Sequence, residues 1–165
     1  IQYCEEHNST FAIPAYINGE VMPICTGVHL REVVKRYPNG ESDIRTVGGK
    51  LFRITELYPK APGKLYAGAE VEPIEITMQG DLGKGTLILE QTALLFELLK
   101  IEKPLPSPEA QFSIFEIAHH LGLSLEQEYE LLTIKGEEER QDYVLSHFDR
   151  ILPVIRQMYR LQEKV

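Results

Sequence analysis

Residues 11–54 read FAIPAYINGE VMPICTGVHL REVVKRYPNG ESDIRTVGGK LFRI, and this stretch decides the fold of the first half of the chain. Short runs of β-branched and aromatic residues alternate with Gly, Pro and Asn, a pattern typical of antiparallel strands joined by turns. Asn18-Gly19 is a strong hairpin signal between a strand at 11–17 and a strand that returns from Val21. The stretch therefore predicts an antiparallel meander.

Two irregularities in this stretch predict local distortions of the strands. The alternation of Val28 and Leu30 gives way to the adjacent pair Val33-Val34, which a β-bulge would explain. Gly48-Gly49 indicates a sharp bend or another bulge. Further extended segments are expected at 65–71 and 74–78.

Helical spacing replaces the strand pattern from Thr86 onward. Ser107 and Ser124 are natural N-caps, Gly122 is a stop signal, and Pro153 should kink the last helix. Four helices are predicted, at 86–100, 107–122, 124–132 and from 137 onward. The fold class is therefore α+β, with a β subdomain at 1–80 and a four-helix subdomain at 81–165.

Composition excludes several classes of partner. The chain has 165 residues and a formal net charge of −8, which disfavours nucleic acid because phosphate binding needs clustered Lys and Arg. No apolar run approaches the ~20 residues that span a bilayer. The two cysteines, Cys4 and Cys25, show no spacing typical of a disulfide framework or a zinc site. We expect a cytoplasmic protein without membrane contact.

The glycine-rich stretch at 80–86 resembles a phosphate-binding loop only superficially. Met78 and Gly85 stand where that loop needs a glycine and a Ser or Thr, so the stretch is interpreted as a hinge between subdomains. His119 and His120 are adjacent and should point about 100° apart, so a metal site is not predicted.

The remaining polar residues suggest packing or solvent roles. His147 is interpreted as a boundary residue, and the run Glu137 to Arg140 as a solvated helix face. The eight tyrosines suit an interface but are expected mostly to cap the core. No catalytic, cofactor-binding or metal-binding residue is predicted, and no cofactor.

The first residues, Ile1 to His7, look like the last turns of a helix and lack the apolar core of a signal peptide. We expect residues upstream of them to have been lost, cleaved or left out.

Two blocks carry a resemblance to a known family. The stretch GVHLREVVKRYPNGESDI at 27–44, followed by Phe52-Arg53-Ile54, resembles the Lon N-terminal, or substrate-binding, domain family, in its short single-domain members. The block LSLEQEYELL at 123–132, with the Glu-rich start of the last helix and Leu152-Pro153, is similar to the helical half of that family.

The resemblance implies a PUA-like β pseudo-barrel with a helical half beside it. It also implies a role in binding unfolded or tagged polypeptides. The Walker motifs and the Ser-Lys dyad of full-length Lon proteases are missing from this sequence, so the resemblance does not imply their hydrolytic activity. The opening strand of the family is missing too, which predicts an unpaired sheet edge filled by a partner chain, a swapped segment or unrecorded residues.

Three functions follow as hypotheses. The first is a non-catalytic module that binds polypeptides, as an adaptor for a separate protease or chaperone, with homodimerisation through the open edge as one form of assembly. The second is a small-molecule sensor, which would need a deep pocket lined by aromatic residues. A hydrolase is the third and least favoured.

Overall fold

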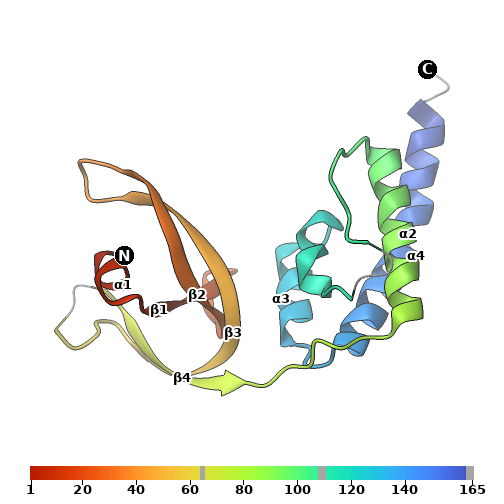
Figure 1. Ribbon diagram of the computed structural model, residues 1–165. Coiled ribbons are helices and arrows are strands. Elements are labelled where there is room, and N and C mark those ends of the chain that lie inside the picture. The colour runs from red at the N-terminus through yellow and green to blue at the C-terminus, as the bar shows by residue number, and fades with distance from the viewer. Residues whose placement is uncertain (64–65, 108–110, 163–165) are drawn as a thin grey trace. The chain divides into compact units, whose positions relative to one another are not determined.

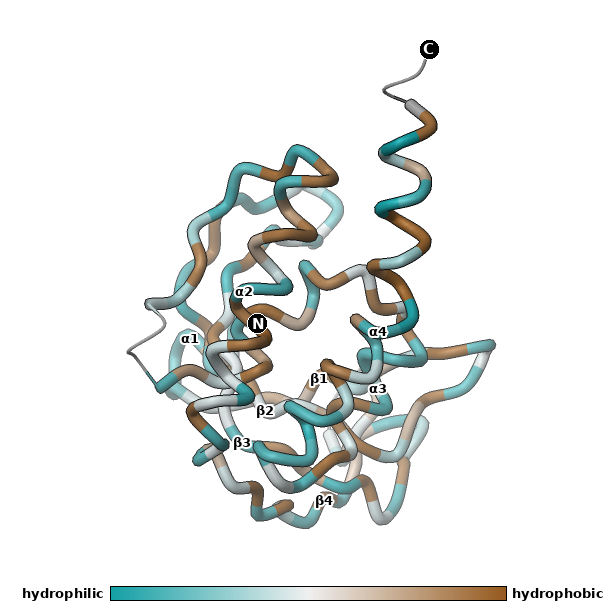
Figure 2. Tube along the Cα trace, turned by 90° about the vertical axis from the view of Figure 1, so that its right-hand side faces the viewer, coloured by the Kyte–Doolittle hydropathy of each residue, from teal (hydrophilic) through white to brown (hydrophobic). Residues whose placement is uncertain are grey.

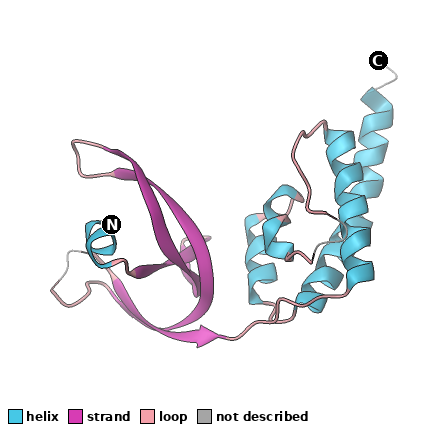
Figure 3. Ribbon diagram, in the orientation of Figure 1, coloured by secondary structure: helices cyan, strands magenta, loops and turns pink. Residues whose placement is uncertain are grey.

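The computed structural model describes residues 1–63, 66–107 and 111–162 and divides into two compact units, Ile1–Glu75 and Ile76–Val165. Figure 1 labels their helices and strands, and Figure 3 separates them by secondary structure. The sequence indicated a division between residues 80 and 81. Each unit is described by itself.

The first unit is a four-stranded antiparallel sheet with the order β1-β2-β3-β4. A short helix, α1 (Gln2–His7), precedes β1 (Thr10–Ile17), β2 (Glu20–Arg36), β3 (Ser42–Tyr58) and β4 (Gly68–Ile74). The predicted meander is confirmed. The predicted pseudo-barrel is wrong in one respect, because β1 and β4 form no ladder with each other in the described residues and the sheet stays open.

The β1–β2 hairpin forms where Asn18-Gly19 predicted it. Ile17 pairs with Glu20, which leaves Asn18 and Gly19 as a two-residue turn. Both turn residues have positive φ, 51° and 89°, as a turn that matches the twist of paired strands requires.

β2 and β3 are two long strands of 17 residues each, and bulges bend them without interrupting them. The register shifts between Leu30 and Glu32, where the broken alternation predicted a bulge. It shifts again where Thr26 pairs with Leu51 but Val28 pairs with Gly48, which confirms the distortion predicted at the glycine pair. Bulges increase local bending, and the two strands curve together in Figure 1.

One strand, β4, stands where two extended segments were predicted, at 65–71 and 74–78. It ends at Ile74, and Thr77 already donates its backbone N–H to Lys135 O in the second unit's own fold. Residue 65, where the first of these segments was predicted to start, lies outside the described residues.

The second unit contains three α-helices in its described residues: α2 (Leu82–Leu99), α3 (Leu125–Thr133) and α4 (Glu137–Gln162). Asp81 caps α2 by accepting from Lys84 N at 2.7 Å, so most of the stretch predicted as a hinge is the start of this helix. The capping box predicted at Ser124 is confirmed, with Gln127 as its partner. Pro153 lies inside α4, and hydrophilic and hydrophobic residues alternate along that helix in Figure 2.

The predicted second helix, and with it the four-helix subdomain, is wrong over the described residues. Two short 3-10 helices, η1 (Ile114–Glu116) and η2 (Ala118–His120), replace it, and residues 108–110 of the predicted helix lie outside the described residues. Ser113 is the reason, because its hydroxyl and the Glu116 carboxylate form a capping box that starts a new turn in mid-segment. Gly122 follows with φ 73°, as the predicted stop requires.

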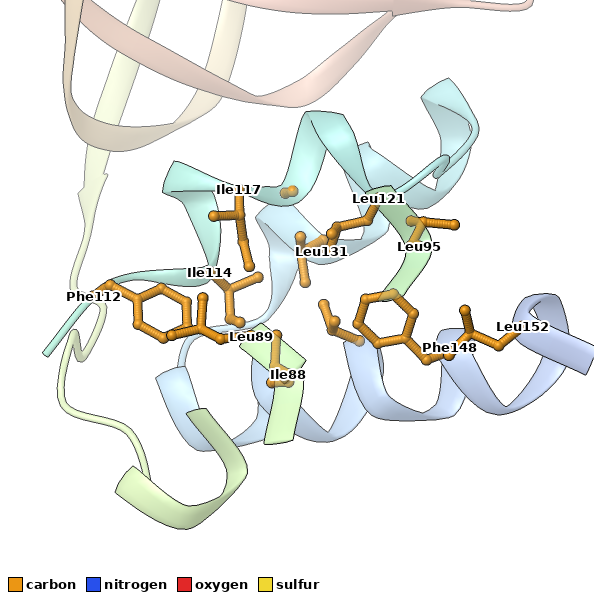
Figure 4. Close-up of a cluster of buried hydrophobic side chains, with 12 residues drawn as sticks. Ile88, Leu89, Leu95, Phe112, Ile114, Ile117, Leu121, Leu131, Phe148 and Leu152 are labelled. Atoms are coloured by element: carbon orange, nitrogen blue, oxygen red, sulfur yellow. The ribbon is translucent and has the colours of Figure 1, made fainter. Parts of the chain in front are cut away.

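The core of the second unit gathers aliphatic and aromatic side chains from α2, η1, η2, α3 and α4, as Figure 4 shows. Val144 and Phe148 of α4 are fully buried against it. The buried cluster comprises Ile88, Leu89, Leu95, Phe112, Ile114, Ile117, Ala118, Leu121, Leu131, Val144, Phe148 and Leu152. None of the helices that the structure describes is both long and apolar enough to cross a membrane.

A buried ion pair anchors the start of α4 and corrects the interpretation of 137–140 as a solvated face. Glu137 and Arg140 are fully buried, and the guanidinium meets the carboxylate at 2.6 and 2.8 Å. Arg140 also donates to the carbonyls of Ile134 and Thr77, while Glu137 accepts from Ile114 N at 2.6 Å. The pair therefore joins the segment before α2, the η1 turn and α4 at one point.

Substituting Arg140→Met should lower the free energy of unfolding of the second unit by about 3–5 kcal/mol, because it leaves a buried carboxylate without its partner. The double variant Glu137→Gln/Arg140→Met should regain part of this loss, since the remaining side chain is uncharged. Urea denaturation followed by circular dichroism measures both values. A loss below 1 kcal/mol for Arg140→Met would contradict a structural role for the pair.

Candidate functional site

The β unit has a pocket of about 670 Å³ on the concave side of its sheet. α1, all four strands and the residues just before β4 contribute to its wall, and Figure 1 shows α1 inside the curve of the sheet. Among the residues that the structure describes, the lining side chains are all uncharged. They are Ile1, Gln2, Tyr3, Cys4, Phe11, Ala12, Pro14, Cys25, Ile54, Leu57, Tyr66, Ala67, Gly68, Ala69 and Val71.

A β-bulge in β3 brings the aliphatic side chains of the pocket wall onto one face. Ile54 pairs with Val71 and Leu57 pairs with Ala69, although Ile54 and Leu57 are three residues apart. A regular strand would place them on opposite faces, but the shift between Ile54 and Glu56 adds one residue to β3. All four side chains therefore line the same pocket.

The opposite face of the same two strands is acidic and polar. Glu56 and Glu70 pair directly across the strands, and both are exposed. The Tyr58 hydroxyl lies 2.8 Å from a Glu70 oxygen and 3.1 Å from a Glu56 oxygen. Hydrogen bonding to Glu70, with burial and the charge of both carboxylates, raises the pKa of Tyr58 well above its usual range. The hydroxyl therefore stays a proton donor between two negative charges.

An ion pair joins α1 to the sheet. Glu5 pairs with Arg36 at the far end of β2, and Asn8 ends the helix in a left-handed conformation with φ 47°. The rings of Tyr3 and His7 stack with their centroids 4.1 Å apart. No residue of α1 is buried, so the helix covers the pocket without closing it.

Both cysteines of the chain border this pocket, and neither forms a disulfide. The Cys25 thiol is fully buried and lies 3.6 Å from Phe52 O, to which it donates. Burial raises the pKa of the Cys25 thiol. Cys4 is half-buried on α1.

The histidines singled out in the sequence lie in the second unit and do not join the pocket. The rings of His119 and His120 are 3.7 Å apart, and Lys103 Nζ lies 3.1 Å from His120 Nδ1. Desolvation, with the charges of His119 and Lys103, lowers the pKa of His120. The Glu116 carboxylate, one turn before His119, accepts from Ser113 N.

His147 was interpreted as a boundary residue, but it is 2% exposed and its Nε2 lies 3.0 Å from Leu121 O. The interpretation was wrong because Leu121 offers a buried carbonyl that an imidazole can satisfy. In the described ranges, no group of three or more His, Cys, Asp and Glu side chains is arranged to hold a metal ion.

The pocket itself was not predicted from the sequence. The sequence carried one sign of it. Ile54 and Leu57 are three residues apart, and in a regular strand this spacing would place them on opposite faces. Ala69 and Val71 do keep strand alternation with Glu70 and Glu72, and this pattern indicates one apolar and one charged face.

Cys4 should react with iodoacetamide faster than Cys25 at pH 7.5, because a buried thiol with a raised pKa is less often a thiolate. The Cys25 rate should rise about tenfold per pH unit while the pH stays below its pKa. Peptide mass spectrometry after timed alkylation measures both rates in the folded protein, and the same measurement in urea provides the control. Equal rates in the folded state would contradict the burial of Cys25.

Comparison with known proteins identifies the fold. No protein-family model matches the chain, and no curated protein sequence matches it. Among solved structures, the crystal structure of a Lon N-terminal domain protein from Xanthomonas campestris matches with a TM-score of 0.61. The match covers 88% of this chain and 79% of that chain, with 20% sequence identity. The chain therefore has the fold of a Lon N-terminal domain protein.

Proposed function

We propose that this chain is a non-catalytic recognition module that binds unfolded or tagged polypeptides and acts as an adaptor for a separate ATP-dependent protease or chaperone. The observation that carries the proposal is the pocket of about 670 Å³, whose described lining residues are uncharged and include residues of both edge strands, β1 and β4. The fold shared with a Lon N-terminal domain protein supports it.

Unfolded polypeptides differ from folded ones in two physical respects that this surface matches. They expose apolar side chains, which gain about 25 cal/mol for each Å² of apolar surface removed from water. They also carry unpaired backbone N–H and C=O groups, which an open strand edge can satisfy with little dependence on sequence. The pocket can bury the exposed apolar side chains, and the open strand edge can pair with the free backbone groups.

The pocket also supports a second candidate, a small apolar ligand. Its volume falls in the range of about 300–1,000 Å³ that is usual for small-molecule sites, and Tyr3, Phe11 and Tyr66 contribute aromatic rings to its wall. Such a ligand would fill the apolar wall but leave the two strand edges unused. We place either activity in a reducing compartment such as the cytoplasm, which suits two free thiols.

A reduced and carboxymethylated model protein, labelled with a fluorophore, tests the leading proposal. The chain should bind it saturably with a Kd on the order of micromolar, as measured by fluorescence anisotropy. The native, disulfide-bonded form of the same model protein provides the matched control and should not bind. Equal binding of both forms, or none of either, would remove the proposal.

A thermal-shift series separates the second candidate from the first. Uncharged aliphatic alcohols of increasing chain length should raise the melting temperature progressively if the pocket takes a small apolar molecule, because a ligand that binds only the folded state stabilises it. A progressive rise with no binding of the unfolded protein would favour the small-molecule candidate, and no rise with any chain length would count against it.

A further inference from the structure

We propose that β4 is the edge that takes up an added strand, and that the strand it selects alternates apolar with basic residues. This inference rests on the proposed function and names its ligand class. It depends on three features of β4: the continuity of its edge, the separation of its two faces, and the charge of the face that points away from the pocket.

Proline distinguishes the two open edges of the sheet. Pro14 lies in the middle of β1, so no run of β1 longer than four residues keeps all of its backbone N–H groups. Pro73 lies next to the last residue of β4, which leaves 68–72 as five consecutive residues without a proline. An incoming strand therefore finds its longest unbroken edge on β4, about 17 Å at ~3.3 Å per residue.

The two faces of β4 differ in chemistry. Ala69 and Val71 line the pocket, while Glu70 and Glu72 alternate with them and point to the other face. A strand added beside β4 continues this alternation, because neighbouring side chains in a sheet share a face. Its residues on the pocket side meet an uncharged wall, and its residues on the other side meet carboxylates.

The charge of the outer face favours basic residues in the added strand. Glu56 and Glu70 stand directly opposite each other, an arrangement that destabilises a sheet. The Tyr58 hydroxyl contacts both carboxylates but has one proton to donate. A Lys or Arg beside Glu70 would offset this repulsion, and Glu72 offers a second carboxylate at the edge although Arg53 of β3 stands opposite it. An acidic residue there would add to it, in a chain whose net charge is already −8.

Three seven-residue peptides with capped ends test the ligand class. One alternates valine with lysine, the second alternates valine with glutamate, and the third has the composition of the first but groups its valines and lysines into two blocks. The valine-lysine peptide should bind at least about tenfold more tightly than either of the others in fluorescence anisotropy. Its affinity should fall as salt rises, because exposed charges contribute.

Amide methylation tests whether the peptide binds as a strand. In an extended chain the N–H groups of successive residues point to opposite edges, so methylating alternate nitrogens removes the donors of one edge and keeps every side chain. With β4 as the only partner, one of the two alternately methylated peptides should lose binding and the other should keep it. Retention by both would overturn strand addition.

Matched protein variants locate the site on β4. Val71→Asp should weaken binding of the valine-lysine peptide about tenfold or more, because it places a charge in the apolar wall. Val21→Asp is its control, since Val21 is also a strand valine and is 40% exposed against 38% for Val71. Glu72→Lys should weaken binding about fivefold, and Glu20→Lys, which changes net charge equally on another strand, should leave it unchanged.

The outcomes separate this inference from the function beneath it. Binding of the unfolded model protein that is unaffected by Val71→Asp and Glu72→Lys would overturn the role of β4 and leave the recognition function standing. No binding of that protein by the unmodified chain would overturn both. Circular dichroism of each variant confirms that it is folded, and the exposed position of Glu72 keeps the test informative should Val71→Asp unfold.

Discussion

The pocket of the β unit depends on one extra residue in β3. Strand side chains alternate strictly between two faces, so a ladder without the bulge would turn Leu57 away from Ile54 and put a carboxylate in its place. The bulge keeps Ile54, Leu57, Ala69 and Val71 on the concave face and sends the glutamates of both strands to the other. The separation of apolar and acidic chemistry across a single sheet follows from that one insertion.

The second unit depends on a buried polar contact, whereas the β unit depends on a bulge in one strand. Glu137 and Arg140 form a buried ion pair at the start of α4. The Glu137 carboxylate also accepts from Ile114 N of the η1 turn, and the Arg140 guanidinium donates to Ile134 O in the segment before α4. The guanidinium also lies 4.6 Å from the centre of the Phe115 ring. Arg suits this position because its planar group can serve several acceptors at once.

Much of the backbone could be predicted from local signals, and most of the site could not. Asn18-Gly19, Ser124 and Gly122 act on their immediate neighbours, so the turn, the capping box and the stop were found where the sequence indicated them. The helix predicted from Ser107 failed because the capping box of Ser113 and Glu116 starts a new turn inside the predicted segment. Residues 137–140 were predicted to be solvated because a run of charged residues in the sequence does not reveal its partners. In the structure, backbone carbonyls and amides surround Glu137 and Arg140.

The pocket was missed for a related reason, since it is made by elements far apart in the sequence. α1, β1 and β4 contribute side chains whose spacing along the chain carries no common period. Only the curvature set by bulges in long strands brings them together. The fold class, the resemblance to Lon N-terminal domains and an unpaired sheet edge were accessible from the sequence, while the failure of the predicted pseudo-barrel to close was not.

The order of the strands has a consequence for how the molecule is built during synthesis. Every ladder in the sheet joins two strands that are consecutive in the chain. Each ladder can therefore form as soon as the second of its strands has left the ribosome. The packing of α2 against α4 joins segments on either side of α3 and must wait until the last helix is made. The β unit can therefore be folded, with its edges open to other chains, while the helical unit is still being translated.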